Sequence, residues 1–577
     1  MNNFWKGVTA VIPLIALTTL INTLYHSQPA SARQTDVGIV MRVYYDNISQ
    51  IDSLARYDLW EYNNLDEQYV LVAGNQATFD RLIGAGWRVD IDPAATFQYT
   101  QASGPFSFFD GYRTVDELYA ALETLNQTYP TLSELVTYGA SLCRQQGGCT
   151  TPDDTVNPGF DLQAIRITNE QIAGSSTISG TNIISGTKPV FFLMANIHAR
   201  EITTPELAMR MAEWLLKGYG TNPDATWLVD WHEIWIVPTT NPDGHWIVEQ
   251  GGSSPPPHRK NGRLLNTCFW PSTSFSQYGV DLNRNHSFGW GGSSTSTFPC
   301  DLLYRGSAPL SEPETAALQD LVSALIPDRR GPELIDTAPT DTQGIFITIH
   351  SYSELVLWPW GHTASPAPNK DELMAIGDKF ATFNGYQSCQ PATCLYAASG
   401  TSDDWAYGDL GIPAFTFEVG TQFMPPYSEI DAVQWPDNGP AFQYAAKLAR
   451  APYQLIHGPD VTAVTTTISP ANQLTITAVI DDSHNGNQSI ASAVYTIDTP
   501  YWTTGAITET LTPADGSFDA PIETGTAVID LNTLTPGRHL LYLRAQDDQG
   551  NWGVVTAVFA NNLQEKVYLP VIGLKRP

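Results

Sequence analysis

Apolar runs of strand length alternate with amphipathic helical patterns across the middle of the chain. Residues 190–195 form the clearest run, which is wholly apolar and has the length of a strand buried on both faces. Two similar runs, 344–350 and 414–418, end in His350 and Glu418. The alternation predicts an α/β domain over residues 104–457, with a mixed, mostly parallel sheet and helices on both faces.

The first helix of this domain carries its own start signal. Thr114 is placed as an N-cap, Glu117 follows three residues later as in a capping box, and Leu118, Leu122 and Leu125 share one face. Further strands are predicted at 162–168 and 233–238, and further helices from Thr204 and Ser311.

A small α+β module is predicted before this domain, over residues 36–100. Its pattern is βαβαβ, with strands at 37–45, 69–73 and 87–91 and helices at 48–56 and 77–85. The module is either a propeptide that covers the active site or a permanent structural part. Its place between an export signal and the main domain favours the propeptide.

Helical patterns stop after Gly458. Residues 458–561 contain strand-length runs separated by Gly, Pro, Asn and Asp, which is typical of an immunoglobulin-like β-sandwich. Its partner cannot be inferred from the sequence. The tail, 562–577, is either a final strand or a sorting or attachment signal.

Residues 1–32 have the features of a signal peptide: Lys6, an apolar segment at 8–24, and small residues at Ala30 and Ala32. A retained membrane anchor is the alternative, although the segment is near the lower length limit for spanning. The mature protein is therefore expected to be exported, either free or held at the cell surface. The net charge of −30 is unsuited to binding nucleic acid or anionic lipid.

Three of the predicted strands end at or just before candidate metal ligands or a candidate general base. His198 and Glu201 directly follow the 190–195 run, and His350 ends the second one. Two imidazoles and one carboxylate form a ligand set suited to Zn²⁺, with the fourth position left for water. Glu418, at the end of the third run, is the candidate general base.

Five segments together resemble the active-site motifs of zinc metallocarboxypeptidases of the carboxypeptidase A/B/T type. In chain order they are HARE (198–201), DLNRN (281–285), IHSYS (349–353), LYAASGTSDDW (395–405) and FTFE (415–418). The resemblance covers roughly residues 111–457 and implies one Zn²⁺ held by His198, Glu201 and His350, with Glu418 as general base.

The resemblance also implies two sites for positive charge. Arg284 and Asn283 would bind the free C-terminal carboxylate of a peptide, which matches the forked geometry of guanidinium. An arginine of the family stabilises the oxyanion that forms on the scissile carbonyl, and the segment HRKNGR offers Arg259 and Arg263. We choose Arg263, although the spacing differs by one residue from the arrangement in the animal enzymes.

Three further residues match substrate contacts of the family. Tyr396 matches a tyrosine that folds over bound substrate, and Tyr352 matches a contact further along the cleft. Asp403, seven residues after Tyr396, matches the acidic pocket residue of carboxypeptidase B-like members, so C-terminal Lys or Arg is an expected preference. Related bacterial members with an acidic residue there also accept apolar side chains.

The six cysteines fall into three neighbouring couples: Cys143/Cys149, Cys268/Cys300 and Cys389/Cys394. Fifteen pairings are open, and the nearest-neighbour pairing is the simplest. The family resemblance supports Cys268/Cys300 most, since animal members have a disulfide near this region.

Two other functions remain open. A zinc hydrolase on the same scaffold could cleave cell-wall peptides or deacylate amino acids. A binding or adhesion protein could instead act through the β-sandwich, but that interpretation requires a broken metal set, and none of its ligands is missing.

Overall fold

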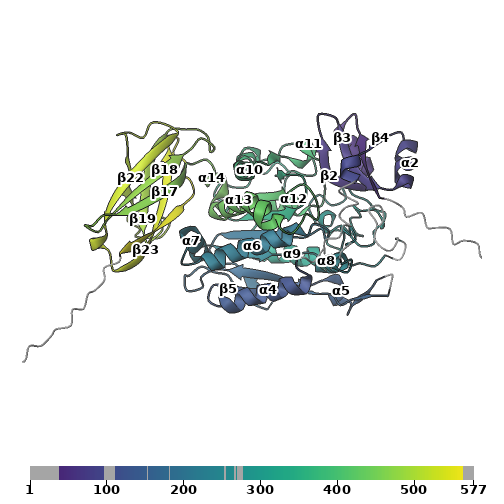
Figure 1. Ribbon diagram of the computed structural model, residues 1–577, viewed down its shortest axis with the longest axis horizontal. Coiled ribbons are helices and arrows are strands. Elements are labelled where there is room, and N and C mark those ends of the chain that lie inside the picture. The colour runs from purple at the N-terminus through teal and green to yellow at the C-terminus, as the bar shows by residue number, and fades with distance from the viewer. Residues whose placement is uncertain are drawn as a thin grey trace, which may run out of the picture.

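The computed structural model describes residues 38–96, 111–151, 154–180, 182–252, 255–265, 268 and 277–562. A mixed sheet of eight strands lies at the centre, with the N-terminal module and the C-terminal domain at opposite ends of the molecule (Figure 1). The predicted signal segment and residues 563–577 of the tail lie outside the described residues. In the part that is described, no helix combines the length and the apolar character needed to cross a bilayer.

The central sheet confirms the expected mixed topology. Its order is β15-β14-β16-β13-β11-β12-β8-β5, with parallel pairing of β11 to β12 and β13, of β13 to β16 and of β14 to β15. The strands are β5 (Ser133–Ala140), β8 (Asp161–Ile167), β11 (Val190–Ala195), β12 (Glu233–Val237), β13 (Ile345–His350), β14 (Leu355–Leu357), β15 (Gln387–Cys389) and β16 (Ala414–Glu418). Two small hairpins lie outside it: β6 (Cys149–Thr150) with β7 (Val156–Asn157), and β9 (Thr177–Ser179) with β10 (Asn182–Ile184).

Helices connect and cover these strands. The capping box at Thr114 is confirmed, because its Oγ1 accepts the Glu117 N–H at 3.2 Å and its own N–H donates to Glu117 Oε2 at 2.9 Å. The longer helices are α4 (Val115–Thr128), α6 (Thr203–Gly218), α7 (Pro223–Trp231), α8 (Pro242–Glu249), α9 (Pro313–Leu325), α10 (Lys370–Asn384), α12 (Ser402–Leu410) and α13 (Trp435–Leu448). Shorter ones are α5 (Leu142–Gln145), η2 (Leu282–Arg284), α11 (Pro391–Cys394), η3 (Ile430–Gln434) and α14 (Pro452–Leu455).

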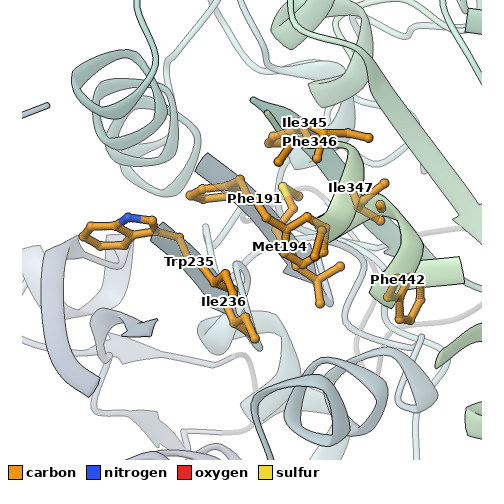
Figure 2. Packing of buried hydrophobic residues seen from close by; sticks show 14 of the residues in the cluster. Phe191, Met194, Trp235, Ile236, Ile345, Phe346, Ile347 and Phe442 are labelled. Carbon is orange, nitrogen blue, oxygen red and sulfur yellow. The ribbon is translucent and has the colours of Figure 1, made fainter. Parts of the chain in front are cut away.

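The core of the α/β domain lies between the sheet and these helices (Figure 2). Phe192 of β11 stacks on Phe346 of β13 at 5.5 Å between ring centroids, and Phe417 of β16 meets Phe442 of α13. Each fully buried aromatic ring contributes about 2–3 kcal/mol through burial. Replacing Phe346 by Ala would therefore cost about 3–5 kcal/mol, because the cavity beside β11 would stay open. This rigid sheet fixes the strand ends at which the site residues lie.

The N-terminal module has one strand more than the sequence predicts. Its antiparallel sheet has the order β2-β3-β1-β4, where β2 was not expected. Its elements are β1 (Ile39–Tyr44), η1 (Ile48–Leu54), β2 (Asp58–Asn64), β3 (Tyr69–Gly74), α2 (Gln76–Gly84) and β4 (Arg88–Ile91). The β2 segment contains Asp58 and Glu61, and both are buried in the structure. Asp and Glu are uncommon in strands, so the sequence pattern of β2 does not indicate a strand. The arginines that allow these acids to be buried lie far away in the chain.

The C-terminal domain consists of two four-stranded antiparallel sheets around one core. One sheet has the order β17-β18-β22-β21 and the other β20-β19-β23-β24. The strands are β17 (Asp460–Ile468), β18 (Gln473–Asp481), β19 (Ile490–Ile497), β20 (Glu509–Thr510), β21 (Thr512–Pro513), β22 (Ile522–Asp530), β23 (Gly537–Asp547) and β24 (Thr556–Asn562), with η4 (Leu531–Thr533) after β22. The predicted strand-rich region is therefore present.

The nearest-neighbour pairing of the cysteines is confirmed. Disulfides join Cys143 to Cys149, Cys268 to Cys300 and Cys389 to Cys394. The second one brackets the DLNRN segment, and the third closes the loop directly before Tyr396.

Candidate active site

Two histidines and a glutamate meet at the ends of β11 and β13. The ligand atoms of His198, Glu201 and His350 all lie within 4.8 Å of one another, and the three side chains are buried. Glu201 accepts at 2.6 Å from His198 Nδ1 and lies 3.2 Å from His350 Nδ1. Burial alone would raise the pKa of Glu201, but the two imidazoles lower it below its ordinary value. A carboxylate held in its charged form between two imidazole nitrogens fits a zinc ligand set.

Backbone contacts fix the loop that carries two of these ligands. Asn196, the residue after β11, has a φ of +56°, a left-handed conformation that Asn adopts more readily than most residues. Its N–H donates to Thr204 Oγ1 at 2.9 Å, and its side-chain amide donates to His198 O at 3.2 Å. The imidazole of His198 is oriented from the other side by Asp281 Oδ1, 3.3 Å from its Nε2.

Glu418 lies beside the cluster because of strand register. It pairs with His350 across the β13–β16 ladder, so both side chains leave the same end of the sheet. One of its carboxylate oxygens is buried without a hydrogen-bond partner. Burial, together with the nearby charges of Glu61 and Glu201, raises the pKa of Glu418 well above its ordinary value. A carboxyl with raised proton affinity, facing a metal cluster, suits proton transfer.

These groups share one cavity with most of the predicted substrate-binding residues. The cavity, of about 40 Å³, has room for only a few water molecules. Its polar lining comprises Glu61, His198, Arg259, Asn283, Arg284, His350, Tyr396, Thr401, Asp403, Thr416 and Glu418.

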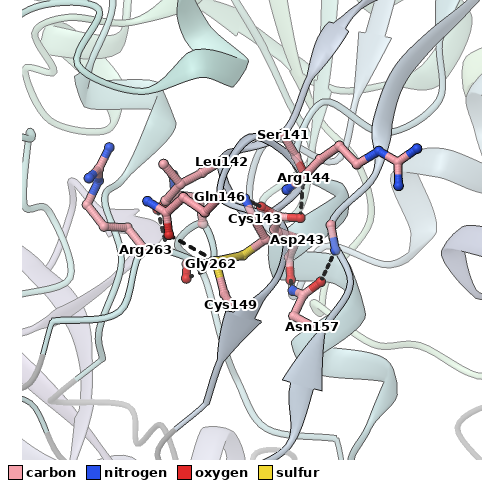
Figure 3. Close-up of a disulfide and its surroundings, with 12 residues drawn as sticks. Ser141, Leu142, Cys143, Arg144, Gln146, Cys149, Asn157, Asp243, Gly262 and Arg263 are labelled. Atoms are coloured by element: carbon pink, nitrogen blue, oxygen red, sulfur yellow. Dashed lines mark hydrogen bonds between the residues drawn. A yellow bond between two sulfur atoms is a disulfide. The ribbon is translucent and has the colours of Figure 1, made fainter.

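Arg259, rather than Arg263, faces this cavity. Arg263 lies outside it and pairs with Glu312 at 2.9 Å, in the region of the Cys143–Cys149 disulfide (Figure 3). The choice of Arg263 for the oxyanion position is therefore corrected. Spacing within HRKNGR did not distinguish the two arginines, whereas Asp281, which accepts from Arg259 Nε at 3.0 Å, directs Arg259 inward.

Asn283 and Arg284 lie on the short helix η2 and both line the cavity. Arg284 is anchored by bonds to two carbonyls, from Nη1 to Asn283 O and from Nε to Ser294 O, each at 2.9 Å. Asn283 Oδ1 accepts the Ser402 N–H at 3.0 Å, at the start of α12. The guanidinium and amide therefore keep fixed positions beside the metal cluster.

Asp403 is buried at the first turn of α12 and also lines the cavity. Its Oδ2 accepts from Thr416 Oγ1 at 3.1 Å, and burial and the neighbouring Asp404 raise its pKa. Asp404 points away to another set of partners, which includes His362 Nδ1 at 2.6 Å and the Gly361 N–H at 2.7 Å. Of the two adjacent acids, Asp403 is the one with a side chain at the cavity.

The N-terminal module supplies a carboxylate to the cavity. Glu61 of β2 accepts from Arg259 Nη1 at 2.7 Å, and its second oxygen is buried without a hydrogen-bond partner. Asp58, on the same strand, accepts from Arg200 Nη1 at 2.9 Å, and all four groups are buried. Neither acid was expected from the sequence, because nothing near them indicates a partner more than a hundred residues away.

Tyr396 and Tyr352 both contact the module, but only Tyr396 lines the cavity. Burial and the charge of Glu61 raise the pKa of Tyr396. Tyr352 packs instead against Trp60 of the module and against Phe423, with ring centroids 5.8 Å and 5.0 Å away.

Residues 118–435 match the protein family described as zinc carboxypeptidase, which is more than half of the chain. The chain belongs to the zinc carboxypeptidase family. Members of this family depend on zinc, and the His198–Glu201–His350 cluster fits such a site by its donor set, burial and close spacing.

Named zinc carboxypeptidases are distant relatives of this chain. Rat carboxypeptidase A2 is 28% identical over 329 residues, which is 56% of this chain and 65% of that protein. A zinc carboxypeptidase of Simulium vittatum is 28% identical over 316 residues, 53% of this chain and 85% of that protein. Rat carboxypeptidase A1 is 25% identical over 409 residues, 69% of this chain and 81% of that protein. The match therefore spans just under two thirds of carboxypeptidase A2.

Solved structures support the same fold. The crystal structure of carboxypeptidase A from Helicoverpa armigera covers 71% of this chain and 98% of its own, with a TM-score of 0.53 and 19% identity. That of thrombin-activatable fibrinolysis inhibitor covers 71% and 98%, with a TM-score of 0.50 and 20% identity.

Proposed function

We propose that this protein is an exported zinc carboxypeptidase that removes C-terminal residues from peptides and is held inactive by its N-terminal module. The observation that carries the activity is the arrangement of one cavity. Two histidines of the His198–Glu201–His350 cluster, a buried carboxyl at Glu418 and the Arg284–Asn283 pair all face it. A metal beside a base would serve many hydrolases, whereas a fixed guanidinium and amide next to them suit a substrate with a free carboxylate.

The residues divide the reaction between them. Zinc held by His198, Glu201 and His350 would supply Lewis-acid chemistry at the scissile carbonyl. Glu418 takes a proton from the water whose oxygen adds to the carbonyl carbon, and passes it to the leaving amine as the C–N bond breaks. Arg259 donates to the carbonyl oxygen as negative charge develops there. Arg284 and Asn283 hold the terminal carboxylate, and Tyr396 closes over the substrate and excludes water.

Asp403 is proposed to select basic C-terminal residues. The Asp403 carboxyl accepts hydrogen bonds from Thr416 Oγ1 and the Asp404 N–H but has no ion-pair partner among the described residues, so Lys or Arg at the C-terminus would pair with it. An apolar side chain would leave Asp403 without a cationic partner and would bind less well.

The module, residues 36–100, is proposed to be an inhibitory propeptide. Glu61 pairs with Arg259, the side chain that would otherwise bind the carbonyl oxygen of the substrate. With Glu61 in place, the cavity of about 40 Å³ is too small for a substrate side chain. Removal of residues 1–32 and then of the module would leave a catalytic domain at 104–457, followed by an immunoglobulin-like sandwich at 458–561. Three disulfides are consistent with export, because disulfides persist in oxidising compartments.

A panel of peptides that differ only in their last residue tests the activity. With zinc supplied and the module cleaved off, we expect stepwise release of single C-terminal residues, which stops when a zinc chelator is added. Release of internal fragments would contradict the proposal. Glu418→Gln should lower kcat by at least about a thousandfold with little change in KM, because it removes the proton acceptor and keeps the shape.

Exchange at Asp403 tests the specificity with the same panel. Asp403→Ile should shift the kcat/KM ratio towards peptides that end in Phe or Leu, and Asp403→Asn should lower the preference for Arg without creating an apolar pocket. Equal Arg-to-Phe ratios in the wild type and both variants would remove Asp403 from the specificity pocket.

A further inference from the structure

Buried carboxylate oxygens without a hydrogen-bond partner occur in five side chains of the described residues. Four of them belong to the active site or to the strand that covers it: Asp58, Glu61, Glu201 and Glu418. The fifth is Asp482, in the loop between β18 and β19 of the C-terminal domain. An unpartnered buried carboxylate is costly, so at the active site it indicates a missing ligand. The same reasoning applies to Asp482.

Two amide oxygens in the same loop share this condition. Asn485 Oδ1 and Gln488 Oε1 are both buried and without a hydrogen-bond partner. The loop folds back on Asp482, whose backbone carbonyl accepts from the N–H groups of Asn485 at 3.0 Å and Asn487 at 2.8 Å. Within eight residues, 481–488, the loop therefore collects three oxygens that can only accept.

The orientation of the first two groups is fixed by their other contacts. Asp482 is fully buried, and its Oδ2 accepts the Gln488 N–H at 2.6 Å, which leaves Oδ1 free. The Asn485 side-chain N–H donates to Gly458 O at 2.6 Å. Because a carbonyl can only accept, this bond fixes the amide orientation and leaves Oδ1 as the free atom.

The charge around Asp482 is negative, and Asp460 is the one neighbouring acid in the described residues that pairs with a cation. Burial and the nearby Asp547, Asp460 and Asp481 raise the pKa of Asp482 to about 6. Asp460 pairs with Lys379 at 2.5 Å, and Asp547 accepts the Asn551 N–H at 2.7 Å. Asp482 takes part in none of the ion pairs found among the described residues.

We propose that the 481–488 loop binds a Ca²⁺ ion through Asp482 Oδ1, Asn485 Oδ1 and Gln488 Oε1. Only oxygen is offered, which suits a hard cation and excludes the softer metals that select nitrogen or sulfur. Irregular loop geometry with amide ligands suits Ca²⁺ better than Mg²⁺, which demands a near-ideal octahedron. Water and backbone carbonyls would complete the coordination. This site is independent of the proposed catalytic function.

The ion would also strengthen the junction between two domains. Asn485 bonds to Gly458, at the boundary between the two domains, and Tyr444 of α13 donates to Asp460 at 2.9 Å. Fixing Asn485 through its Oδ1 would stabilise this junction, so Ca²⁺ should raise the melting temperature of the whole chain.

Calorimetric titration of CaCl₂ into the full, zinc-loaded chain tests the site. We expect one saturable binding event that Asp482→Asn weakens at least about tenfold, because it removes the charged ligand and keeps the size. Asp548→Asn is the matched control: Asp548 is exposed, and its N–H bonds to Ser489 O beside the loop. This variant makes the same charge change and should bind Ca²⁺ like the wild type.

A second variant covers the case in which Asp482→Asn fails to fold. Gln488→Ala removes one proposed ligand without touching the buried charge, and should also weaken Ca²⁺ binding. A hundredfold excess of Ca²⁺ over its Kd should raise the Tm by about 2 °C or more. Equal Ca²⁺ titrations of the wild type, Asp482→Asn and Gln488→Ala, or no saturable binding at all, would overturn the proposal and leave ordered water as the partner of these oxygens.

Discussion

The N-terminal module and the C-terminal domain both pack on the α/β domain through aromatic rings, but only the module adds buried carboxylates at the active site. The module places Asp58 and Glu61 on Arg200 and Arg259 beside the metal cluster. The C-terminal domain contacts α7 through aromatic rings, with Trp502 5.9 Å from Trp231 between ring centroids.

The two contacts differ in whether they involve residues of the proposed reaction. Glu61 of the module pairs with Arg259, which the proposed reaction requires, so under that proposal module binding excludes catalysis. The C-terminal contact uses none of the cavity residues, and Lys447 and Ala557 N both bond to Asp224 within it. Under the proposed function, the module is the part to be released and the C-terminal domain the part that stays in place.

Cleavage within residues 97–110 is expected to give the largest effect. Release of the module frees Arg259, so kcat/KM for a short peptide should rise by at least about a hundredfold. Rates before and after cleavage at an inserted protease site measure this. A site inserted at Ala471, in the exposed β17–β18 turn, is the control and should change nothing. If the uncleaved chain were already fully active, the module would not be inhibitory.

Trp502→Ala tests the other contact. It should lower the free energy of unfolding by about 2 kcal/mol, since the ring is half-buried against Trp227, Trp231 and the Arg450 guanidinium. Denaturant unfolding measures the loss, and kcat/KM of the folded enzyme should not change. Ile507→Ala, at a side chain that is 75% exposed, is the control. Lost activity in the folded Trp502 variant would show that the two contacts are not separate.

Glu61→Gln in the uncleaved chain should have a smaller effect than cleavage. It weakens the pair with Arg259 but keeps the module in place, so residual activity should rise about tenfold. Glu67→Gln, an exposed position on the same module, is the matched control. Activity that rises equally in both variants would mean that the charge of Glu61 is not what holds the module on the site.

The smallest expected effect is a pH dependence of stability that arises inside the α/β domain, on which the module and the C-terminal domain both pack. Burial, with the charges of Asp243 and Glu312, raises the pKa of Glu314 to about 8. A carboxyl whose folded pKa is raised stabilises the fold fully below its unfolded pKa and loses that contribution as pH rises through the folded value. The Tm should therefore fall by a few degrees between about pH 4.5 and pH 8. Glu314→Gln should flatten this dependence, and an unchanged slope would show that Glu314 does not cause it.

Much of the fold follows from local pattern. Residues 190–195 and 414–418 were predicted as strands with the bounds that the structure has, because short runs rich in apolar and aromatic residues favour a buried strand. The Thr114 capping box is equally local. Strand β2 was missed because its buried acids read as surface residues, and their partners Arg200 and Arg259 lie far away in the chain.

The amino-acid sequence by itself determined which residue types sit at the strand ends, and so the identity of the metal cluster and of Glu418. It could not decide between Arg259 and Arg263, which lie four residues apart on one loop. Only the tertiary structure did so, because Asp281 and Glu61 draw the first into the cavity while Glu312 holds the second outside. The sequence shows which charged side chains are present. Where a buried charged side chain points depends on its ion-pair partners, and only folding brings these close to it.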